Sequence, residues 1–297
     1  MENGYVIATD STTDMSRHYY EENNIAYIGM HYTMDGTEYI QYSDEELPVK
    51  EFYSKVREGS LPKTSQVAYD DLVNLFQSII DDNKDVFYLC FSSALSGSYQ
   101  TALLAANDLT EKNPGRKIVV VDSVSASGGE GLLLNLCVAK RDKGVTLEEL
   151  TEYAENIKHN VVHLFTVDDL NHLHRGGRVS KLSAVVGGML GIKPILYVSD
   201  TGHLLPYAKI RGRKQSLEAM AKQMKEKYTP GQNEEIYICD GDAREDAEYL
   251  GNLIMKMMPD VKKVRYDSVG AVIGTHSGPG TVALFFIGKE RIPVEIK

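Results

Sequence analysis

The chain has 297 residues, of which 42% are hydrophobic, and its formal net charge at pH 7 is −10. This composition can supply a substantial core in one large or two ordinary domains, and we expect two. The acidic balance argues against a sequence-wide electrostatic attraction to nucleic acid or to anionic membranes, although a local basic patch remains compatible with it.

The first residues, MENGYVIATD, lack the basic and apolar regions of a secretory signal, and no later segment approaches about 18 uninterrupted apolar residues. We therefore expect a cytoplasmic protein that makes at most transient membrane contact. Cys90, Cys137 and Cys239 lie far apart in apolar segments and show no metal-ligand spacing. We expect buried free thiols, no metal site and no cofactor.

Apolar runs and helical periodicity alternate along the chain. The apolar runs predict strands at residues 5–9, 86–91, 117–122, 161–167, 194–198, 235–240 and 282–288. The periodic segments predict helices at residues 67–81, 97–112, 127–143, 147–158, 213–228 and 243–258. This alternation is typical of an α/β fold.

The two halves of the chain differ in how their strands are spaced. In the first half, helical crossovers favour a parallel sheet that is covered on both faces. In the second half, LYVSDTGHLLPYAKIRG predicts a hairpin around Thr201 and Gly202, which indicates a mixed sheet. We expect closely packed domains at residues 1–160 and 161–297, with a site at their interface.

Four clusters of small polar residues interrupt this framework: ATDSTTD (8–14), KTSQ (63–66), SSALSGSYQ (92–100) and THSGPGT (275–281). Ligands of open α/β sheets bind beyond the carboxyl ends of strands, so the first and third clusters are candidates for the rim of one site. For Asp10, Ser11 and Thr12, a capped turn is an equally good explanation.

Ser96, at a predicted strand-to-helix turn, is a candidate either for a nucleophile or for a ligand-holding hydroxyl. The hydrolase motif GxSxG fails here, because Ala94 and Ser98 occupy the two glycine positions. His276 is a possible base, but the sequence does not pair it with a serine and a carboxylate. A cluster of hydroxyl donors at a helix start needs no base.

These four clusters, together with DDLNHLHRGGRVSKLSAVVGGMLGIKPIL (168–196), resemble the DegV family of bacterial fatty-acid-binding proteins over essentially the whole chain. The resemblance implies an N-terminal three-layer α/β/α domain with a parallel sheet and a C-terminal two-layer α/β domain with a mixed sheet. A fatty acid would be enclosed between or beside them. Relatives of the family include the ligand-binding subunit of dihydroxyacetone kinases.

Carried over position by position, the resemblance implies that Thr64 and Ser96 hold the lipid carboxylate, and that His276 and Arg175 extend this network. Arg178 lies one helical turn from Arg175 and is the alternative guanidinium. Two positions depart from the family pattern, Val67 where proline is frequent and Ser98 where threonine is common, but neither change removes a hydroxyl from the site. Hydrogen bonds from neutral donors to a carboxylate contribute about 1.5 to 3 kcal/mol.

The lipid tail needs an apolar groove, and burial of each CH₂ contributes about 0.8 kcal/mol, so the tail should dominate affinity. The segment LSAVVGGMLGIKPILYV is a candidate lining, in which Gly187, Gly188 and Gly191 would leave room for the tail. An equally good explanation is that these glycines only permit close helix packing.

A cluster of basic residues lies apart from these motifs and comprises Lys209, Arg211, Arg213 and Lys214. It is either a solvated surface or a docking site for a partner. The DegV resemblance implies that a separate fatty acid kinase phosphorylates the bound fatty acid to an acyl phosphate used in phospholipid metabolism.

This chain carries no Walker A or kinase motif, so we expect a binding subunit rather than an enzyme. The alternatives are a lipid hydrolase and a triose-kinase-like substrate-binding subunit. A nucleic-acid-binding role is disfavoured, because the chain is acidic and has no recognisable reading motif.

Overall fold

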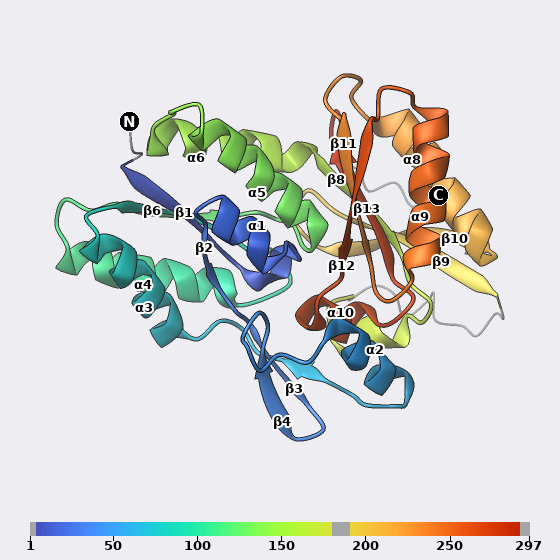
Figure 1. Cartoon of the computed structure of the whole chain (residues 1–297), viewed down its shortest axis with the longest axis horizontal. Coiled ribbons are helices and arrows are strands. Elements are labelled where there is room, and N and C mark those ends of the chain that lie inside the picture. Colours follow the sequence, from blue (N-terminus) through green and yellow to red (C-terminus); the bar gives the residue numbers. More distant parts are fainter. Residues whose placement is uncertain (1–3, 180–190, 292–297) are drawn as a thin grey trace.

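The computed structural model describes residues 4–179 and 191–291 (Figure 1). The strands of this part of the chain are β1 (Tyr5–Asp10), β2 (Ala26–Ile28), β3 (His31–Met34), β4 (Thr37–Ile40), β5 (Lys63–Thr64), β6 (Asp85–Cys90), β7 (Ile118–Asp122), β8 (Val161–Thr166), β9 (Ile192–Val198), β10 (Leu204–Arg211), β11 (Glu235–Asp240), β12 (Lys263–Ser268) and β13 (Val282–Ile287). The helices are α1 (Arg17–Glu22), α2 (Val49–Arg57), α3 (Tyr69–Asp81), α4 (Ser98–Lys112), α5 (Gly128–Arg141), α6 (Leu147–Ile157), α7 (Asn171–Arg175), α8 (Arg213–Lys227), α9 (Arg244–Met257) and α10 (Ala271–Ser277). The predicted strands and helices of the sequence analysis are all present, with ends shifted by at most two residues.

The first sheet has the strand order β2-β1-β6-β7, and all its pairs are parallel. Successive residues of β1 point to opposite faces, so Ile7 packs in the core with α5 and α6 while Ala8 packs in the core with α3 and α4. Phe87 and Tyr88 of β6 divide between the two cores in the same way. The prediction of a parallel sheet covered on both faces is confirmed.

The second sheet has the order β10-β9-β8-β13-β11-β12 and is mixed: only β11 and β12 pair in parallel. The predicted hairpin is formed by β9 and β10, with a turn closed by the hydrogen bond from Gly202 N to Ser199 O (3.0 Å). Leu164 and Leu284 face α8 and α9, whereas Phe165 and Phe285 face the first half of the chain.

Helix α5 lies between the two sheets, where it contacts β8, β11 and β13 (Figure 1). A single hydrophobic core therefore contains Leu133 of α5, Phe87 of the first sheet and Phe285 of the second. The second sheet begins at Val161, next to the predicted boundary. The division into domains at residues 1–160 and 161–297 stays a prediction, because α5 contacts the second sheet and shares one hydrophobic core with the first.

The sequence analysis missed the strands β2 and β12, the helices α1, α2, α7 and α10, and a small antiparallel sheet of order β4-β3-β5. These elements are short, and β5 contains only Lys63 and Thr64. Phe52 and Tyr53 of α2 pack in one core with Val272 of α10. Through this contact the small sheet brings the KTSQ cluster beside the THSGPGT cluster, which is more than two hundred residues later in the sequence.

The three cysteines are buried and free, as predicted. Among the helices of the described residues, none is both long and apolar enough to cross a membrane. Most of the predicted tail lining, including Gly187 and Gly188, lies outside the described residues; Gly191 is described and has a left-handed φ of +83°.

Candidate functional site

A cavity of about 170 Å³, here called the apolar cavity, lies between the turn that follows β6, the start of α5, the inner face of the second sheet, and α10. Its apolar walls include Phe91, Leu95, Phe165, Val272, Ala283 and Phe285. Because alternate residues of β8 and β13 share a face, Phe165, Ala283 and Phe285 extend as a continuous strip beneath the cavity.

Four polar side chains lie together at one part of the cavity lining, and we call them the polar end: Thr64, Ser96, Arg178 and His276. They come from the small sheet, the turn before α4, the segment after α7, and α10. The structure therefore brings together three of the four residues expected to bind the ligand, Thr64, Ser96 and His276.

The turn that carries Ser96 is fixed by hydrogen bonds to the backbone and to a neighbouring hydroxyl. Ser96 N donates to Ser92 O (3.2 Å), and the Ser96 and Ser98 hydroxyl oxygens are 2.9 Å apart. Ser98 Oγ also accepts from Val67 N (3.1 Å), which joins this turn to the loop after Thr64. The serine that departs from the family pattern thus supports the site.

Thr64 Oγ1 lies 2.8 Å from His276 Nε2. The pKa of His276 is lowered to about 4, because burial disfavours the charged imidazole and the positive charge of Arg178 lies nearby. His276 is therefore neutral at pH 7 and carries one ring proton.

The position of that proton decides what Thr64 can do. His276 Nδ1 is buried and has no hydrogen-bond partner among the described residues. With the proton on Nε2, His276 donates to Thr64 Oγ1, no buried N–H is left unpaired, and the Thr64 hydroxyl proton is free to be donated to a ligand. In this tautomer the Thr64 hydroxyl proton is available to an acceptor in the cavity.

The turn after His276 requires glycine. Gly278 and Gly280 have φ values of +77° and +81°, which side chains rarely adopt. A Cβ at Gly278 would meet the ring of His172, and one at Gly280 would meet the carboxylate of Asp168. The THSGPGT cluster is therefore a tightly packed turn that fixes the end of α10.

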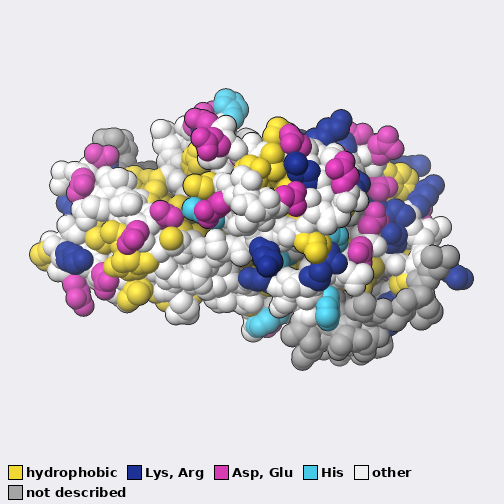
Figure 2. All heavy atoms as spheres, turned by 90° about the horizontal axis from the view of Figure 1, so that it is seen from below, with side chains coloured by type: hydrophobic (Ala, Val, Ile, Leu, Met, Phe, Trp, Pro, Cys, Tyr) yellow, Lys and Arg dark blue, Asp and Glu magenta, His cyan; other side chains and the backbone are white. Residues whose placement is uncertain are grey.

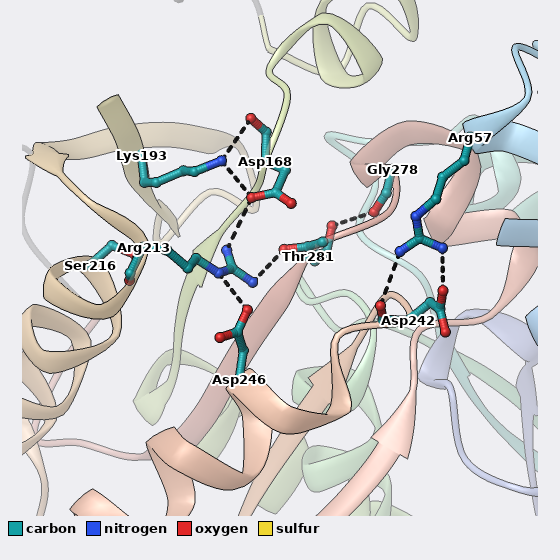
Figure 3. A network of polar contacts seen from close by, with 10 residues as sticks. Arg57, Asp168, Lys193, Arg213, Ser216, Asp242, Asp246, Gly278 and Thr281 are labelled. Atoms are coloured by element: carbon teal, nitrogen blue, oxygen red, sulfur yellow. Dashed lines mark hydrogen bonds and ion pairs between the residues drawn. The ribbon is translucent and has the colours of Figure 1, made fainter. Parts of the chain in front are cut away.

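Arg213 anchors the same turn from outside (Figure 3). Its guanidinium donates to Gly280 O (2.7 Å) and to Asp246 Oδ2 (2.8 Å), and it lies 3.8 Å from Asp168 Oδ1. Lys193 pairs with the same Asp168 oxygen at 2.6 Å. The charge of Arg213 is thus matched by carboxylates.

The other members of the predicted docking cluster are more accessible. Lys209, Arg211 and Lys214 are exposed, and the Lys214 ammonium lies 5.2 Å from the centre of the Tyr249 ring. Of the four predicted residues, Arg213 alone makes ion pairs among the described residues. Partner docking by this cluster stays a prediction.

The structure separates the two arginines of RGGR. Arg178 lines the apolar cavity and donates to Leu95 O (3.1 Å) and Gly176 O (2.5 Å), so its guanidinium is fixed beside the Ser96 turn. Arg175 does not line that cavity; it lies in a neighbouring pocket, with its Nη2 3.0 Å from His172 Nδ1. At the polar end, the guanidinium present is that of Arg178.

The ATDSTTD cluster forms a buried turn rather than a wall of the cavity. Asp10 accepts from Thr12 N (2.9 Å) and from Phe91 N (3.1 Å), and Thr12 also donates to Glu130 (2.9 Å). Burial raises the pKa of both Asp10 and Glu130. The sequence left two explanations for this cluster, a ligand-site rim and a capped turn, and the structure shows a capped turn. The hydrogen bond from Phe91 N to Asp10 also supports the neighbouring turn that carries Ser96.

The hydrogen bonds of the polar end do not form a nucleophile-activating chain. Ser96 contacts Ser98 rather than a histidine, and His276 contacts Thr64 while its other nitrogen has no carboxylate partner in the described part of the chain. A serine nucleophile requires a base and a group that orients the base. In residues 4–179 and 191–291 there is also no group of three potential metal-binding side chains.

The sequence analysis did not single out His163, which lines the cavity from β8. Its Nδ1 lies 3.0 Å from Val161 O, and burial lowers its pKa well below the usual value. The sequence did contain a signal for this position: the period of two in VVHLFTV places His163 on the same face of the strand as Phe165.

Comparison with known proteins agrees with this architecture. The model of the DegV family, described as uncharacterised proteins, matches residues 5–289. A DegV domain-containing protein of Clostridium perfringens is 40% identical over 97% of this chain and 99% of its own length.

Several similar solved structures are described by lipid or fatty acid binding. A DegV family protein from Thermus thermophilus, described by its fatty acid binding, is 27% identical with a TM-score of 0.86 over 96% of this chain and 99% of that chain. A Thermotoga maritima protein described as revealing a fatty acid binding function is 29% identical, with a TM-score of 0.83 over 97% of this chain and 100% of that chain.

Proposed function

The chain belongs to the DegV family, and on that premise we propose that it binds a long-chain fatty acid. The tail occupies the apolar cavity and the carboxylate lies at the polar end. The observation that carries this proposal is a cavity with apolar walls whose lining also contains, at its polar end, the hydroxyls of Thr64 and Ser96, the neutral His276 and Arg178. Such a cavity matches one amphipathic ligand with an anionic head.

The carboxylate would be held by charge-assisted hydrogen bonds from Thr64 and Ser96. His276 acts through Thr64 by donating to its oxygen, which turns the threonine proton toward the ligand. Arg178 supplies the nearby positive charge and is the preferred guanidinium for this role, in place of Arg175. A carboxylate in this position is desolvated but compensated in charge.

We further infer that the protein presents the bound fatty acid to a separate kinase, which transfers phosphate from ATP to the carboxylate. The acyl phosphate formed would enter phospholipid metabolism. Lys209, Arg211 and Lys214 are exposed and stand apart from the cavity lining, which suits a docking surface for an acidic partner. Arg213 would support this surface and the His276 turn together. The chain itself acts as a ligand-binding subunit.

The test is extraction of the natively purified protein followed by mass spectrometry. We expect about one long-chain fatty acid per chain, and acyl phosphate formation when a fatty acid kinase catalytic subunit and ATP are added. An empty protein that hydrolyses lipid esters, or one that binds dihydroxyacetone instead, would contradict the proposal and favour an enzyme or a triose-kinase-like subunit.

A further inference from the structure

Ser98, the first residue of α4, lies directly behind the hydroxyl of Ser96. It is fully buried, with 0% of its surface exposed, and unlike Ser96 and Gly97 it does not line the apolar cavity. The face of the molecule seen in Figure 2 carries many charged side chains that solvent can reach, whereas the Ser98 hydroxyl has to find its hydrogen-bond partners inside the protein. Ser98 can therefore act on a bound ligand only through its neighbours.

The Ser98 hydroxyl oxygen has two hydrogen-bond partners among the described residues. Val67 N donates to it at 3.1 Å, and the Ser96 hydroxyl oxygen lies 2.9 Å away. Because the Val67 N–H can only donate, the Ser98 proton has one acceptor left, the Ser96 oxygen. The opposite direction, from Ser96 to Ser98, would leave the buried Ser98 proton without an acceptor, which is costly. The hydrogen bond therefore runs from Ser98 to Ser96.

This direction determines where the Ser96 proton points. Ser96 Oγ also accepts from Ser98 N (3.2 Å), so both of its lone pairs are occupied by Ser98. Its own proton is left for the apolar cavity, which Ser96 lines. A hydroxyl that accepts a hydrogen bond also becomes a stronger donor, because hydrogen bonds in a chain polarise one another. Ser98 thus has the same relation to Ser96 that His276 has to Thr64.

Ser98 has a second contact, with the loop that follows Thr64. Val67 and Ser98 are the two positions at which this chain departs from the family pattern, and the structure places them in contact. Proline, which is frequent in the family at position 67, has no N–H, so this hydrogen bond depends on the departure. Two roles of Ser98 therefore have to be separated by experiment: holding this loop and donating to Ser96.

We propose that Ser98 is a positioning residue of the carboxylate site, which acts through Ser96 by directing the Ser96 proton toward an anionic head group. The proposal rests on the proposed fatty acid binding and adds to it a residue that does not touch the ligand. A carboxylate can only accept hydrogen bonds, so it depends on this proton direction. The hydroxyl of a long-chain alcohol can either accept or donate, so it does not depend on it.

The experiment uses the full-length protein freed of lipid, with hexadecanoate and hexadecanol as probes. The test variant is Ser98→Ala, and Ser98→Thr restores the hydroxyl. The matched control is Thr110→Val, which removes a hydroxyl from an exposed position of the same helix. Affinity is measured by calorimetry, and circular dichroism checks that each variant folds. The carboxyl ¹³C signal of labelled hexadecanoate reports the hydrogen bonds that the head group accepts.

We expect Ser98→Ala to bind hexadecanoate about three- to tenfold more weakly than wild type and to shift the carboxyl ¹³C signal, with hexadecanol affinity changed by less than about twofold. Ser98→Thr should restore both the affinity and the signal, and Thr110→Val should change neither. Added to Ser96→Ala, the Ser98→Ala change should weaken hexadecanoate binding by less than about a further twofold, because it acts through the same hydroxyl.

Val67→Pro separates the two roles of Ser98, since it removes the N–H but keeps the contact between Ser96 and Ser98. We expect it to change hexadecanoate affinity by less than about twofold, which is well below the effect of Ser98→Ala. A loss as large as that of Ser98→Ala would assign the effect to the loop after Thr64 and overturn the proposal. If Ser98→Ala does not fold, Ser98→Cys, whose thiol is a weak donor, takes its place in the same comparison.

Equal weakening of hexadecanoate and hexadecanol by Ser98→Ala would overturn the proposal, because it would show a general loss of cavity shape. Unchanged hexadecanoate affinity, or independent effects of Ser96→Ala and Ser98→Ala, would overturn it as well. A wild-type protein that does not bind hexadecanoate would contradict the proposed function itself. A wild type that binds it, with a Ser98→Ala variant of equal affinity, would contradict only the role of Ser98.

Discussion

The apolar wall and the polar end of the same cavity are built in different ways. The wall is assembled from alternate residues of β8 and β13, such as Phe165, Ala283 and Phe285, which any regular strand places on one face. The polar end instead depends on Thr64 and His276, whose contact spans most of the chain. Tail burial therefore depends on a repeating strand pattern and little on the exact placement of any one side chain. Head-group fixation depends on a few contacts between residues far apart in the sequence.

The largest effect should come from filling the apolar wall. Ala283→Trp would displace about five methylene groups of the ligand and weaken fatty acid binding by about 4 kcal/mol, roughly a thousandfold. Calorimetric titration of lipid-free protein measures this loss. Ala283→Gly, which adds space, is the control and should retain binding; circular dichroism checks that both variants fold. Unimpaired binding by the tryptophan variant would place the tail elsewhere.

Changes at the polar end should be smaller, and should affect orientation rather than tail burial. Ser96→Ala and Thr64→Val each remove one charge-assisted hydrogen bond, and we expect a loss of about 1.5 to 3 kcal/mol in head-group fixation. Fatty acid should still co-purify with both variants, while kinase-dependent phosphorylation should fall.

A serine-directed phosphonate separates this prediction from hydrolase chemistry. We expect it to label neither the wild type nor the two variants, because Ser96 contacts Ser98 rather than a base. Labelling of Ser96 in a protein that carries no fatty acid would favour an enzyme.

The polar end should also give the protein a measurable pH dependence. The pKa of His276 is about 4 in the folded state, against 6.5 for an ordinary histidine, so the unfolded chain binds more protons between these values. Its contribution to stability is therefore complete above about pH 6.5 and is lost as the pH falls toward 4. Between pH 7 and pH 5 we expect the contribution of His276 to the free energy of unfolding to fall by about 2 kcal/mol.

Urea unfolding of the wild type and of His276→Gln at both pH values isolates this contribution, since glutamine keeps an N–H donor but does not titrate. Asp14 has a pKa raised to about 7 by burial and shifts stability with the opposite sign, but it is common to both proteins and cancels in the difference. Identical pH dependence of the two proteins would show that His276 is not held neutral by the fold.

The smallest effect on fatty acid affinity should come from the exposed cations Arg211 and Lys214, which do not line the cavity. Arg211→Glu/Lys214→Glu should change fatty acid affinity by less than about 0.5 kcal/mol, but should reduce acyl phosphate production by the partner kinase. Arg213→Ala provides the contrast: it removes the contact with Gly280 O and should lower thermal stability as well. Equal acyl phosphate production with wild type and with the double variant would contradict a docking role for Arg211 and Lys214.

The sequence by itself determined most of the regular elements, because their signals are local. The capping box of α6 is an example: Glu149 N donates to Thr146 Oγ1 (3.2 Å) and Thr146 N donates to Glu149 Oε2 (2.8 Å), as residues three apart at a helix start predict. The period of two in the strands likewise predicted which residues share a face. Ser96, Thr64 and His276 were singled out because small polar residues interrupt such patterns, and the DegV resemblance gave them a common role.

Only the tertiary structure decided how these pieces meet. No local pattern indicates that β5, a strand of two residues, brings Thr64 to His276, or that α5 contacts the second sheet and also shares a hydrophobic core with the first. Arg175 and Arg178 belong to the same short motif, RGGR, and only packing decides that Arg178 lines the apolar cavity while Arg175 lines the neighbouring pocket alone. Arg213 was grouped with exposed cations by its sequence neighbours, yet its carboxylate partners come from distant elements. Such contacts depend on the packing of segments far apart in the chain, which periodicity and spacing do not encode.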